Sequence, residues 1–394
     1  MSYFQGYITC TLAVITSIMP LFGQVAKLDI KTAAHIARFK ELGFEYLDPA
    51  MHPSRYPNNK DGTIDKLIHI YNTDGTSDVK LAKLPVFPRA FSLQINLDTL
   101  TPEGLAELER QKNLHVLHLE GEKNLKQFIP VFEKLKSVKC LAISDQIITP
   151  AILNGIAKMP ALVELSITES KTLFSKIENA RAIGKMKNIR TLDLSGTGFS
   201  GLQLLQIDKV PYTALILSGC VGVNSYCTID FIKMQSLKNM GLAGTSIFDS
   251  DVISLAESLK LVELDISDTP ITNKCLNTIK NMKSLRLFTA SNTKIDDDGL
   301  KEFQEMKQLV ALELRKTKIT GAGMVYLKDL SNLTYLNVSE NAIDDKGIEQ
   351  LHGLKNLKYL ALGETKMTKT GLAKLKTALP KCMISNSGEM YLKD

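Results

Sequence analysis

The side chains that could carry chemistry in this sequence are histidines, paired carboxylates and cysteines. His115 and His118 look like a metal-binding pair, but an odd spacing in a predicted strand places their side chains on opposite faces. The GxSxG, HExxH and P-loop motifs of hydrolases, zinc proteases and nucleotide-binding proteins do not occur. We therefore expect no catalytic residues, no metal site and no cofactor, and we predict that the protein is not an enzyme.

Paired aspartates at 296–297 and 344–345 look like parts of a calcium cluster. Both pairs stand where a helical segment is predicted to begin, and there N-capping and the helix dipole explain acidic residues. Residues 59–65 (NKDGTID) resemble half of a calcium-binding loop, but Pro57 and Ile68 occupy the positions of its first and twelfth ligands. We interpret none of these segments as a calcium site.

The six cysteines stand at positions 10, 140, 220, 227, 275 and 382. They form no CxxC motif and have no histidine at the spacing of a zinc site. Only Cys220 and Cys227 are close enough in sequence to suggest a local disulfide. Buried free thiols are the favoured interpretation, and whether this pair is bonded stays open.

An internal repeat predicts the elements that carry these residues. The pattern LxxLxL recurs from about residue 89, and its last apolar residue falls at Ile95, Leu119, Ile143, Ile167, Leu194, Leu217, Leu242, Ile266, Ala290, Leu314, Val338 and Leu362. Successive copies are 24 residues apart, except for steps of 27, 23 and 25 between positions 167 and 242. The length alone suggests two or three domains, but this regularity predicts one repeating domain.

Each unit combines a strand with a helical segment. In the unit that begins at Leu309, Leu312 and Leu314 share one face of a short strand with period two. Met324 and Leu327 then continue the apolar pattern every three residues, as in a short helix or 3₁₀ turn. One unit cannot bury this apolar set alone, so neighbouring units must stack into a shared core.

These residues resemble the leucine-rich repeat family, in a 24-residue variant similar to the cysteine-containing subclass, as in exported bacterial members. The resemblance rests on ITNKCL (271–276), IDDDGL (295–300), IDDKGI (343–348) and LTPEGL (100–105). It implies an α/β fold, a right-handed solenoid or horseshoe with a parallel sheet on the concave face and short helices outside. The fold by itself does not give the function.

In the family, an asparagine after the strand bonds backbone groups of adjacent repeats. Here Asn341 keeps that residue and Cys220 replaces it once, while threonine occupies the slot at 197, 245, 269, 293, 317 and 365. A buried threonine hydroxyl can donate to a carbonyl and accept from an amide. We therefore predict that these threonines perform the task of the asparagine.

Strand alternation allows the concave side chains to be read from the sequence. One row runs Gln94, His118, Ala142, Ser166, Asp193, Ile216, Gly241, Asp265, Thr289, Glu313, Asn337 and Ala361. A neighbouring row is mostly serine and predicts a shallow, open groove. The candidate ligand-binding residues are Glu164, Asp193, Glu263, Asp265, Glu313, Arg315, Tyr335 and Tyr359. The two tyrosines, one repeat apart, form the best aromatic anchor.

The composition, 44% hydrophobic and 23% charged, is that of an ordinary soluble protein and argues against a disordered or multi-span membrane protein. The excess of positive charge is only +6. Lysines at 112, 136, 187, 283, 307 and 355 share one slot before successive strands and predict a positively charged rim. The acids leave the concave groove partly negative, so we expect no nucleic acid there.

The ends of the chain depart from the repeat. Residues 1–26 carry no charged side chain and resemble a signal peptide, although the basic n-region is missing and an uncleaved anchor stays open. We assign 27–88 to an N-terminal capping region with a helix over 32–42 and a degenerate strand over 64–70. Residues 89–378 hold the repeats, and 379–394 form a C-terminal cap and tail.

The predicted function is a non-enzymatic interaction scaffold, exported to the periplasm, cell surface or medium, that binds a protein or peptide through its concave face. One alternative is a cell-envelope or surface structural protein that binds polysaccharide. Another is an intracellular substrate adaptor of the ubiquitin-ligase type. Membrane attachment is expected only if the N-terminal segment is uncleaved. The irregular stretches 168–182 and 218–231 predict either a partner-binding loop or simple drift of the repeat.

Overall fold

The computed structural model describes residues 30–42, 44–47, 68–72, 76–122, 124–170, 173–386 and 389–391. The chain divides into two compact units, one that ends at Cys220 and one that begins at Val221. The predicted signal peptide and the calcium-like segment 59–65 lie outside the described residues. The predicted domain limits stay predictions.

The strands of the first unit follow one another across the sheet in chain order. They are β1 (Phe44–Leu47), β2 (Ile68–Asn72), β3 (Phe91–Asn96), β4 (Leu114–Glu120), β5 (Cys140–Ser144), β6 (Glu164–Thr168), β7 (Thr191–Asp193) and β8 (Ala214–Ile216). β1 is antiparallel to β2, and the pairs from β2 to β8 are parallel. The register aligns one leucine from each of β3 to β8, at 93, 117, 141, 165, 192 and 215.

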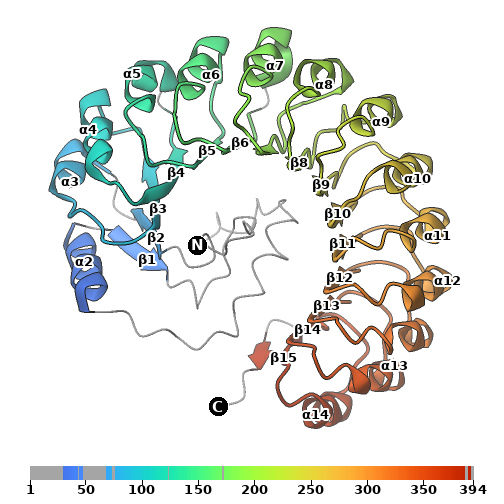
Figure 1. The fold of residues 1–394 in the computed structure, drawn as a ribbon. Helices are drawn as coiled ribbons and strands as arrows, with labels where there is room; N and C mark the ends of the chain where they lie inside the picture. Colours follow the sequence, from blue (N-terminus) through green and yellow to red (C-terminus); the bar gives the residue numbers. More distant parts are fainter. Residues whose placement is uncertain are drawn as a thin grey trace. The chain divides into compact units, whose positions relative to one another are not determined.

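The helical segments of this unit lie on the outer side of the sheet (Figure 1). They are α2 (Ile30–Glu41), α3 (Asp78–Lys83), α4 (Pro102–Ala106), η3 (Glu107–Arg110), η4 (Leu125–Phe128), α5 (Ile129–Phe132), α6 (Pro150–Ile156), η5 (Leu173–Ser175), α7 (Ile177–Ile183) and α8 (Gly201–Ile207). Most are one or two turns long, because each unit must return to the next strand within about 24 residues. Helix α2 matches the helix predicted over 32–42, two residues earlier at its start.

An aromatic cluster covers the N-terminal end of the first unit. The ring of Phe39 on α2 meets those of Phe44, Phe87 and Phe91 at centroid distances of 5.9, 5.6 and 6.2 Å, each nearly edge to face. All four side chains are buried. This contact is what a capping segment needs, because the first repeat would otherwise expose its apolar core.

The second unit repeats the same architecture. Its strands are β9 (Asn239–Gly241), β10 (Glu263–Asp265), β11 (Leu287–Thr289), β12 (Ala311–Glu313), β13 (Tyr335–Asn337), β14 (Tyr359–Ala361), β15 (Met383–Asn386) and β16 (Glu389–Tyr391). They are parallel up to β15, and β16 turns back antiparallel to it. The outer segments are α9 (Ser225–Phe231), α10 (Asp249–Ser258), η6 (Asn273–Cys275), α11 (Leu276–Ile279), α12 (Asp297–Leu300), η7 (Lys301–Glu305), η8 (Gly321–Leu327), α13 (Asp345–Glu349), η9 (Gln350–Gly353) and α14 (Lys369–Ala378).

The predicted leucine-rich repeat solenoid is confirmed in both units. Each of the twelve residues that ended the sequence pattern, from Ile95 to Leu362, is at most 1% exposed. These residues stand in the strands or directly after them, and the helical segments lie on the opposite side of each repeat (Figure 1). Stacked units therefore bury what one unit could not.

The turn after each strand from β4 to β14 uses a left-handed residue. Seven positions that are not glycine adopt φ between 51° and 58°: Asp145, Glu169, Asp268, Asn292, Lys316, Glu340 and Glu364. In the three repeats between Glu169 and Asp268, glycines 196, 219 and 244 fill the same slot. The left-handed region costs an L-residue about 1–2 kcal/mol. The packing of the units must offset that cost, since lysine and glutamate carry no turn signal in the sequence.

The threonine slot has part of the predicted role: its hydroxyls donate to a carbonyl of their own repeat, while the bridge between repeats is made by Asn341. Thr293 Oγ1 donates to the carbonyl of Ala290 at 2.7 Å, and Thr245 and Thr269 make the equivalent bond at 2.6 and 2.5 Å. Asn341 Nδ2 bridges two repeats, donating to the carbonyls of Leu314 (2.7 Å) and Val338 (3.0 Å). The slot thus satisfies carbonyls that the short strands leave without a ladder partner.

A second hydrogen-bonded connection joins repeats on the outer side. Asp297 accepts from both the amide (2.7 Å) and the hydroxyl (2.6 Å) of Thr320, the residue that caps η8 in the next repeat. The pairs Asp249–Thr272 and Asp345–Thr368 repeat the arrangement. We call these contacts the Asp–Thr clamps. The N-cap prediction holds for Asp296 and Asp344, which accept from amides of their own segments, whereas Asp297 and Asp345 bond the following repeat.

We expect Thr293→Val to lower the free energy of unfolding by about 1–3 kcal/mol, because valine keeps the volume but leaves the carbonyl of Ala290 without its donor. Urea denaturation followed by circular dichroism measures this. The matched control is Thr370→Val on the exposed side of α14, for which we expect a change within about 0.5 kcal/mol. Equal midpoints for both variants would contradict the assigned role of the slot.

We expect Gly323→Ala to destabilise the protein by about 1–3 kcal/mol, because its Cβ would overlap the carboxylate of Asp297 and force the Asp–Thr clamp apart. Gly353→Ala is the control, since a Cβ there meets nothing closer than the carbonyl of Lys328 at 3.9 Å. Thermal unfolding of the two variants measures the difference. A Gly323→Ala protein as stable as Gly353→Ala would disprove the steric argument.

Candidate ligand-binding face

The inner face of the second unit presents two aligned rows of side chains. Parallel register places Asp265, Thr289, Glu313, Asn337 and Ala361 side by side from β10 to β14. The second row aligns Glu263, Leu287, Ala311, Tyr335 and Tyr359. The structure therefore brings five of the eight predicted site residues into these two rows, and Arg315 follows at the end of β12.

The acids on this face are buried, which differs from the open groove that the sequence predicted. Glu263, Asp265 and Glu313 are 8%, 1% and 7% exposed. Side chains on the inner side of a curved parallel sheet converge, and neighbouring strands lie only about 4.8 Å apart. The small hydroxyl residues between the acids do not keep the groove as open as their size suggests.

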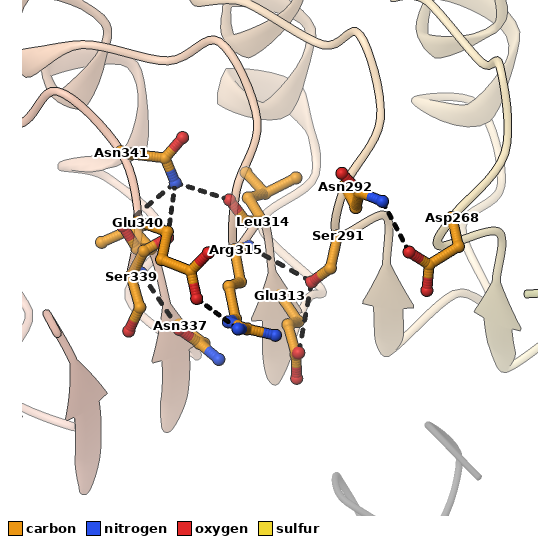
Figure 2. Close-up of polar contacts among 11 residues, drawn as sticks. Asp268, Ser291, Asn292, Glu313, Leu314, Arg315, Asn337, Ser339, Glu340 and Asn341 are labelled. Atoms are coloured by element: carbon orange, nitrogen blue, oxygen red, sulfur yellow. Dashed lines mark hydrogen bonds and ion pairs between the residues drawn. The ribbon is translucent and has the colours of Figure 1, made fainter. Parts of the chain in front are cut away.

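Hydrogen bonds fix Glu313 in this face. Its Oε1 accepts from the hydroxyl of Ser291 at 3.2 Å, and its Oε2 accepts from the phenol of Tyr335 at 3.3 Å. Figure 2 shows the Ser291 contact beside the end of β12. Ser291 Oγ also accepts from the amide of Arg315 at 3.2 Å, so the serine row connects successive repeats. Serine at these positions thus has a structural role that its small size alone did not reveal.

The two acids of β10 differ from Glu313 in their partners. Asp265 Oδ1 accepts from the amide of Ser267 at 2.9 Å, while its Oδ2 is buried and has no hydrogen-bond partner among the described residues. Glu263 forms no hydrogen bond or ion pair with the described part of the chain, and its Oε2 is buried. β10 therefore holds two carboxylates whose capacity to accept hydrogen bonds is largely unused.

Burial raises the pKa of these carboxyl groups. The pKa of Glu263 rises to about 7 through desolvation. Desolvation also raises the pKa of Asp265 to about 7, against the lowering effect of its Ser267 bonds, and the charge of Glu313 adds to the rise. The pKa of Glu313 is raised by burial as well, although Ser291, Tyr335 and Arg315 oppose the shift. Ionising this face at neutral pH costs free energy unless a positive charge arrives.

The predicted tyrosine anchor is a stacked pair within the face. The rings of Tyr335 and Tyr359 lie 5.2 Å apart and are parallel within 5°. Tyr335 is only 3% exposed, and Tyr359 is half-buried. The pair therefore forms a wall beside Glu313.

Arg315 pairs with an acid of the rim, and its charge also lowers the pKa of Glu313. Its guanidinium pairs with the carboxylate of Glu340 in the following turn (Figure 2). Asn292 Nδ2 donates to Asp268 at 2.7 Å in the corresponding turns nearby (Figure 2). These turn residues make a rim of cross-repeat pairs, and the sequence carries no signal for them because the partners of each pair lie about one repeat apart.

Glu164 and Asp193 belong to the first unit and form a separate cluster. Asp193 accepts from the amide (3.0 Å) and hydroxyl (2.6 Å) of Ser195 and from the hydroxyl of Ser166 (3.2 Å). Glu164 lies beside Cys140, and desolvation, then the Glu164 charge and hydrogen bond, raise the pKa of that thiol. Both acids are buried. This cluster is already supplied with donors from its own strands.

A histidine contact in the first unit escaped the sequence analysis. His69 Nδ1 and Ser92 Oγ lie 2.5 Å apart on β2 and β3, and the rings of His69 and His118 meet edge to face at 5.7 Å. His115, by contrast, is not part of this contact, and burial followed by the charge of Lys139 lowers its pKa. Parallel register could have suggested the grouping, had the position of β2 been known.

The comparisons with known proteins identify the repeat. A family profile described as leucine rich repeat matches residues 307–367. This chain carries leucine-rich repeats. No curated protein sequence matches the chain.

Solved structures with similarity to the repeats include two from Listeria monocytogenes and one from Leptospira interrogans. An internalin from Listeria is 20% identical, with a TM-score of 0.44 over 73% of this chain and 77% of that one. An internalin C2 from the same species is 24% identical, with a TM-score of 0.40 over 56% and 84%. A leucine-rich repeat protein of Leptospira is 15% identical, with a TM-score of 0.38 over 78% and 91%.

The lysine row of the repeats lies at helix ends. Lys112, Lys187 and Lys283 each donate through Nζ to a carbonyl three residues earlier, at 3.0, 2.8 and 3.3 Å. Lys355 donates to the carbonyl of Ala378 at 2.9 Å. Carbonyls at a helix C-terminus favour a positive charge, so the row has a capping role as well as a place on the rim.

The cysteines of the described repeats are free thiols, at 140, 220, 227, 275 and 382. Cys220 and Cys227 are therefore not bonded to each other, as the favoured interpretation predicted. Cys220 takes the threonine slot and donates to the carbonyl of Leu194 at 3.2 Å. Within the described ranges, no group of three His, Cys, Asp or Glu residues could hold a metal ion, and no helix is long and apolar enough to cross a membrane.

We expect Glu263→Gln to stabilise the leucine-rich repeats at pH 8 by about 2–3 kcal/mol, with little effect near pH 4. The folded pKa of about 7 lies above the unfolded value of about 4.3, so the native state binds its proton more tightly. Wild-type stability therefore falls as pH rises from about 4 to 7, and the amide removes this loss.

Urea denaturation at both pH values measures the effect. Asp265 and Glu313 are present in both the wild type and Glu263→Gln, and burial raises the pKa of each. The difference in stability between the two proteins therefore isolates Glu263. Glu257→Gln, on the exposed side of α10, is the charge-matched control and should show no pH-dependent gain. Equal behaviour of the two variants would contradict the burial of an unpaired Glu263.

Proposed function

We propose that the protein is a non-enzymatic interaction scaffold that binds a protein or peptide through the inner face of its leucine-rich repeats. The observation that carries this proposal is the chain of fixed contacts from Ser291 through Glu313 to Tyr335, which continues in the stacked ring of Tyr359. These groups are held in place before any partner arrives. Binding to such a face loses little conformational entropy, because few side chains must be ordered.

The concave face suits an extended protein surface better than a small substrate. Its functional groups come from five successive strands, β10 to β14, with one or two residues from each. Aromatic and carboxylate groups spread over that many strands match the mixture of anchors and polar contacts that protein interfaces use. The nucleophile and base of a hydrolytic enzyme were not found in the sequence motifs, which supports the non-enzymatic proposal.

The two alternatives from the sequence have weaker support. A polysaccharide or other acidic ligand would use the lysine row, but four of its six members donate to helix carbonyls. The adaptor alternative gains no observation from the described residues. Export remains part of our proposal and rests on the uncharged, apolar segment 1–26.

We expect Asn337→Arg to weaken partner binding at least tenfold, because it adds bulk and charge to the inner row without removing a core side chain. The partner is first captured with the full-length protein, and the dissociation constant of the purified pair is then measured by calorimetry. Tyr335→Ala/Tyr359→Ala should weaken binding as well, by removing the aromatic wall.

Tyr326→Ala on the outer segment η8 is the matched control and should bind like the wild type. Circular dichroism melting verifies that each variant is folded. Folded Asn337→Arg protein that binds its partner with unchanged affinity would rule out the concave face as the binding surface.

A further inference from the structure

Building on the proposed function, we propose that Glu263, Asp265 and Glu313 form a subsite for a cationic side chain, arginine or lysine, of the protein partner. The stacked Tyr335 bounds this subsite on one side. We call the three carboxylates with Tyr335 the cation subsite. It specifies the chemistry of the partner residue that docks at the centre of the second unit.

The placement of the three carboxylates follows from the strands. Glu263 and Asp265 stand two residues apart on β10 and therefore project from the same face, with Leu264 between them pointing into the core. Glu313 lies in register with Asp265, with only Thr289 between them. The charge of Glu313 acts on Asp265, which places the two carboxyl groups within electrostatic reach of each other.

Unused hydrogen-bonding capacity points to a ligand. Glu263 is 8% exposed, yet it makes no hydrogen bond or ion pair with the described residues. Asp265 is 1% exposed, and its Oδ2 has no partner among them. Buried carboxylates are normally paired, because an unpaired charge in a protein interior costs several kcal/mol. Asp193 in the first unit and Glu313 both accept hydrogen bonds from neighbouring strands. The two acids of β10 largely lack such partners.

The surrounding strands do not supply the missing positive charge. The strand residues of β9 to β13 include no lysine or arginine. Arg315, which follows β12, pairs with Glu340 in the rim and lowers the pKa of Glu313, but no lysine or arginine lowers the pKa of Glu263 or Asp265. A cation that enters this subsite must therefore come from outside these strands.

The chemistry favours a cationic side chain carried by a protein. A guanidinium or ammonium group can donate several hydrogen bonds at once to carboxylates on neighbouring strands. The ring of Tyr335 is held by its stacking on Tyr359 and by its bond to Glu313, and a fixed aromatic face beside acids adds to the attraction for a cation. A metal ion is a poorer fit, since the described side chains include no group of three ligands at coordinating distances.

Binding of small probes to the full-length protein tests the subsite directly. At pH 8 we expect calorimetry or a thermal shift to detect L-argininamide, and L-lysinamide in the same range, but not neutral L-citrullinamide at equal concentration. Glu263→Gln/Asp265→Asn should weaken argininamide binding at least tenfold. The control Glu257→Gln, which neutralises one exposed carboxylate on the outer side of α10, should leave it unchanged.

Three results would overturn the proposal: equal binding of argininamide and citrullinamide, undiminished argininamide binding by the double variant, or a response to Ca²⁺ alone. Loss of folding is not expected to confuse the outcome, because neutral amides remove the repulsion among buried acids. Unfolding curves of the double variant verify this.

Partner binding separates this proposal from the broader one. A partner lost by Asn337→Arg but bound normally by Glu263→Gln/Asp265→Asn would refute the cation subsite and leave the concave face as the binding surface. A partner that binds both variants like the wild type would refute both proposals. A tenfold or greater loss with each variant supports both.

Discussion

The structure depends on one constraint: a 24-residue unit cannot bury its own apolar side chains. One leucine is aligned in each strand from β3 to β8, and one apolar residue in each strand from β9 to β15. These side chains are covered only because the strand of the next repeat lies about 4.8 Å away. Every other feature serves this stacking. The Phe39 cluster covers the end of one unit, where the next repeat is missing, and the short outer segments close the core from the side opposite to the strands.

Tight stacking requires that polar groups be satisfied within each short unit or by its neighbour. The threonines donate hydrogen bonds to carbonyls just after the strands, and the lysine row donates to carbonyls at helix ends. The Asp–Thr clamps connect the starts of successive outer segments. The serine row does the same on the inner side, where it also holds Glu313. Because these connections already occupy most polar side chains, the unpartnered Glu263 on β10 stands out against its surroundings.

The sequence predicted the fold well because periodicity is a direct consequence of stacking. All twelve core positions and the alternation that puts Asp265, Glu313 and Asn337 in one row follow from spacing alone, whereas the threonine slot was recognised from the family resemblance. The site was less predictable, because its properties depend on neighbours one repeat away. The burial of Tyr335, the turn of Arg315 toward Glu340 and the His69–Ser92 contact each join residues at least 22 positions apart. Spacing gives the face of a side chain but not its partner.

The Asp–Thr clamps have a consequence for how such a chain can grow. In the second unit the clamping aspartates stand at 249, 297 and 345, so there the clamp recurs every 48 residues, since 297 − 249 = 345 − 297 = 48, which is two repeats. A further clamp, Asp78–Thr101, lies in the first unit outside this series. Of the two intervening joints, one uses Asn273 and Asp296 instead, and the other places Gly321 against Asp344. Removing a single repeat after Asp297 would bring it opposite Asp344, carboxylate against carboxylate, whereas removing two would restore a threonine. Gene duplication or protein engineering in this region therefore preserves the Asp–Thr clamps only when repeats are added or removed in pairs.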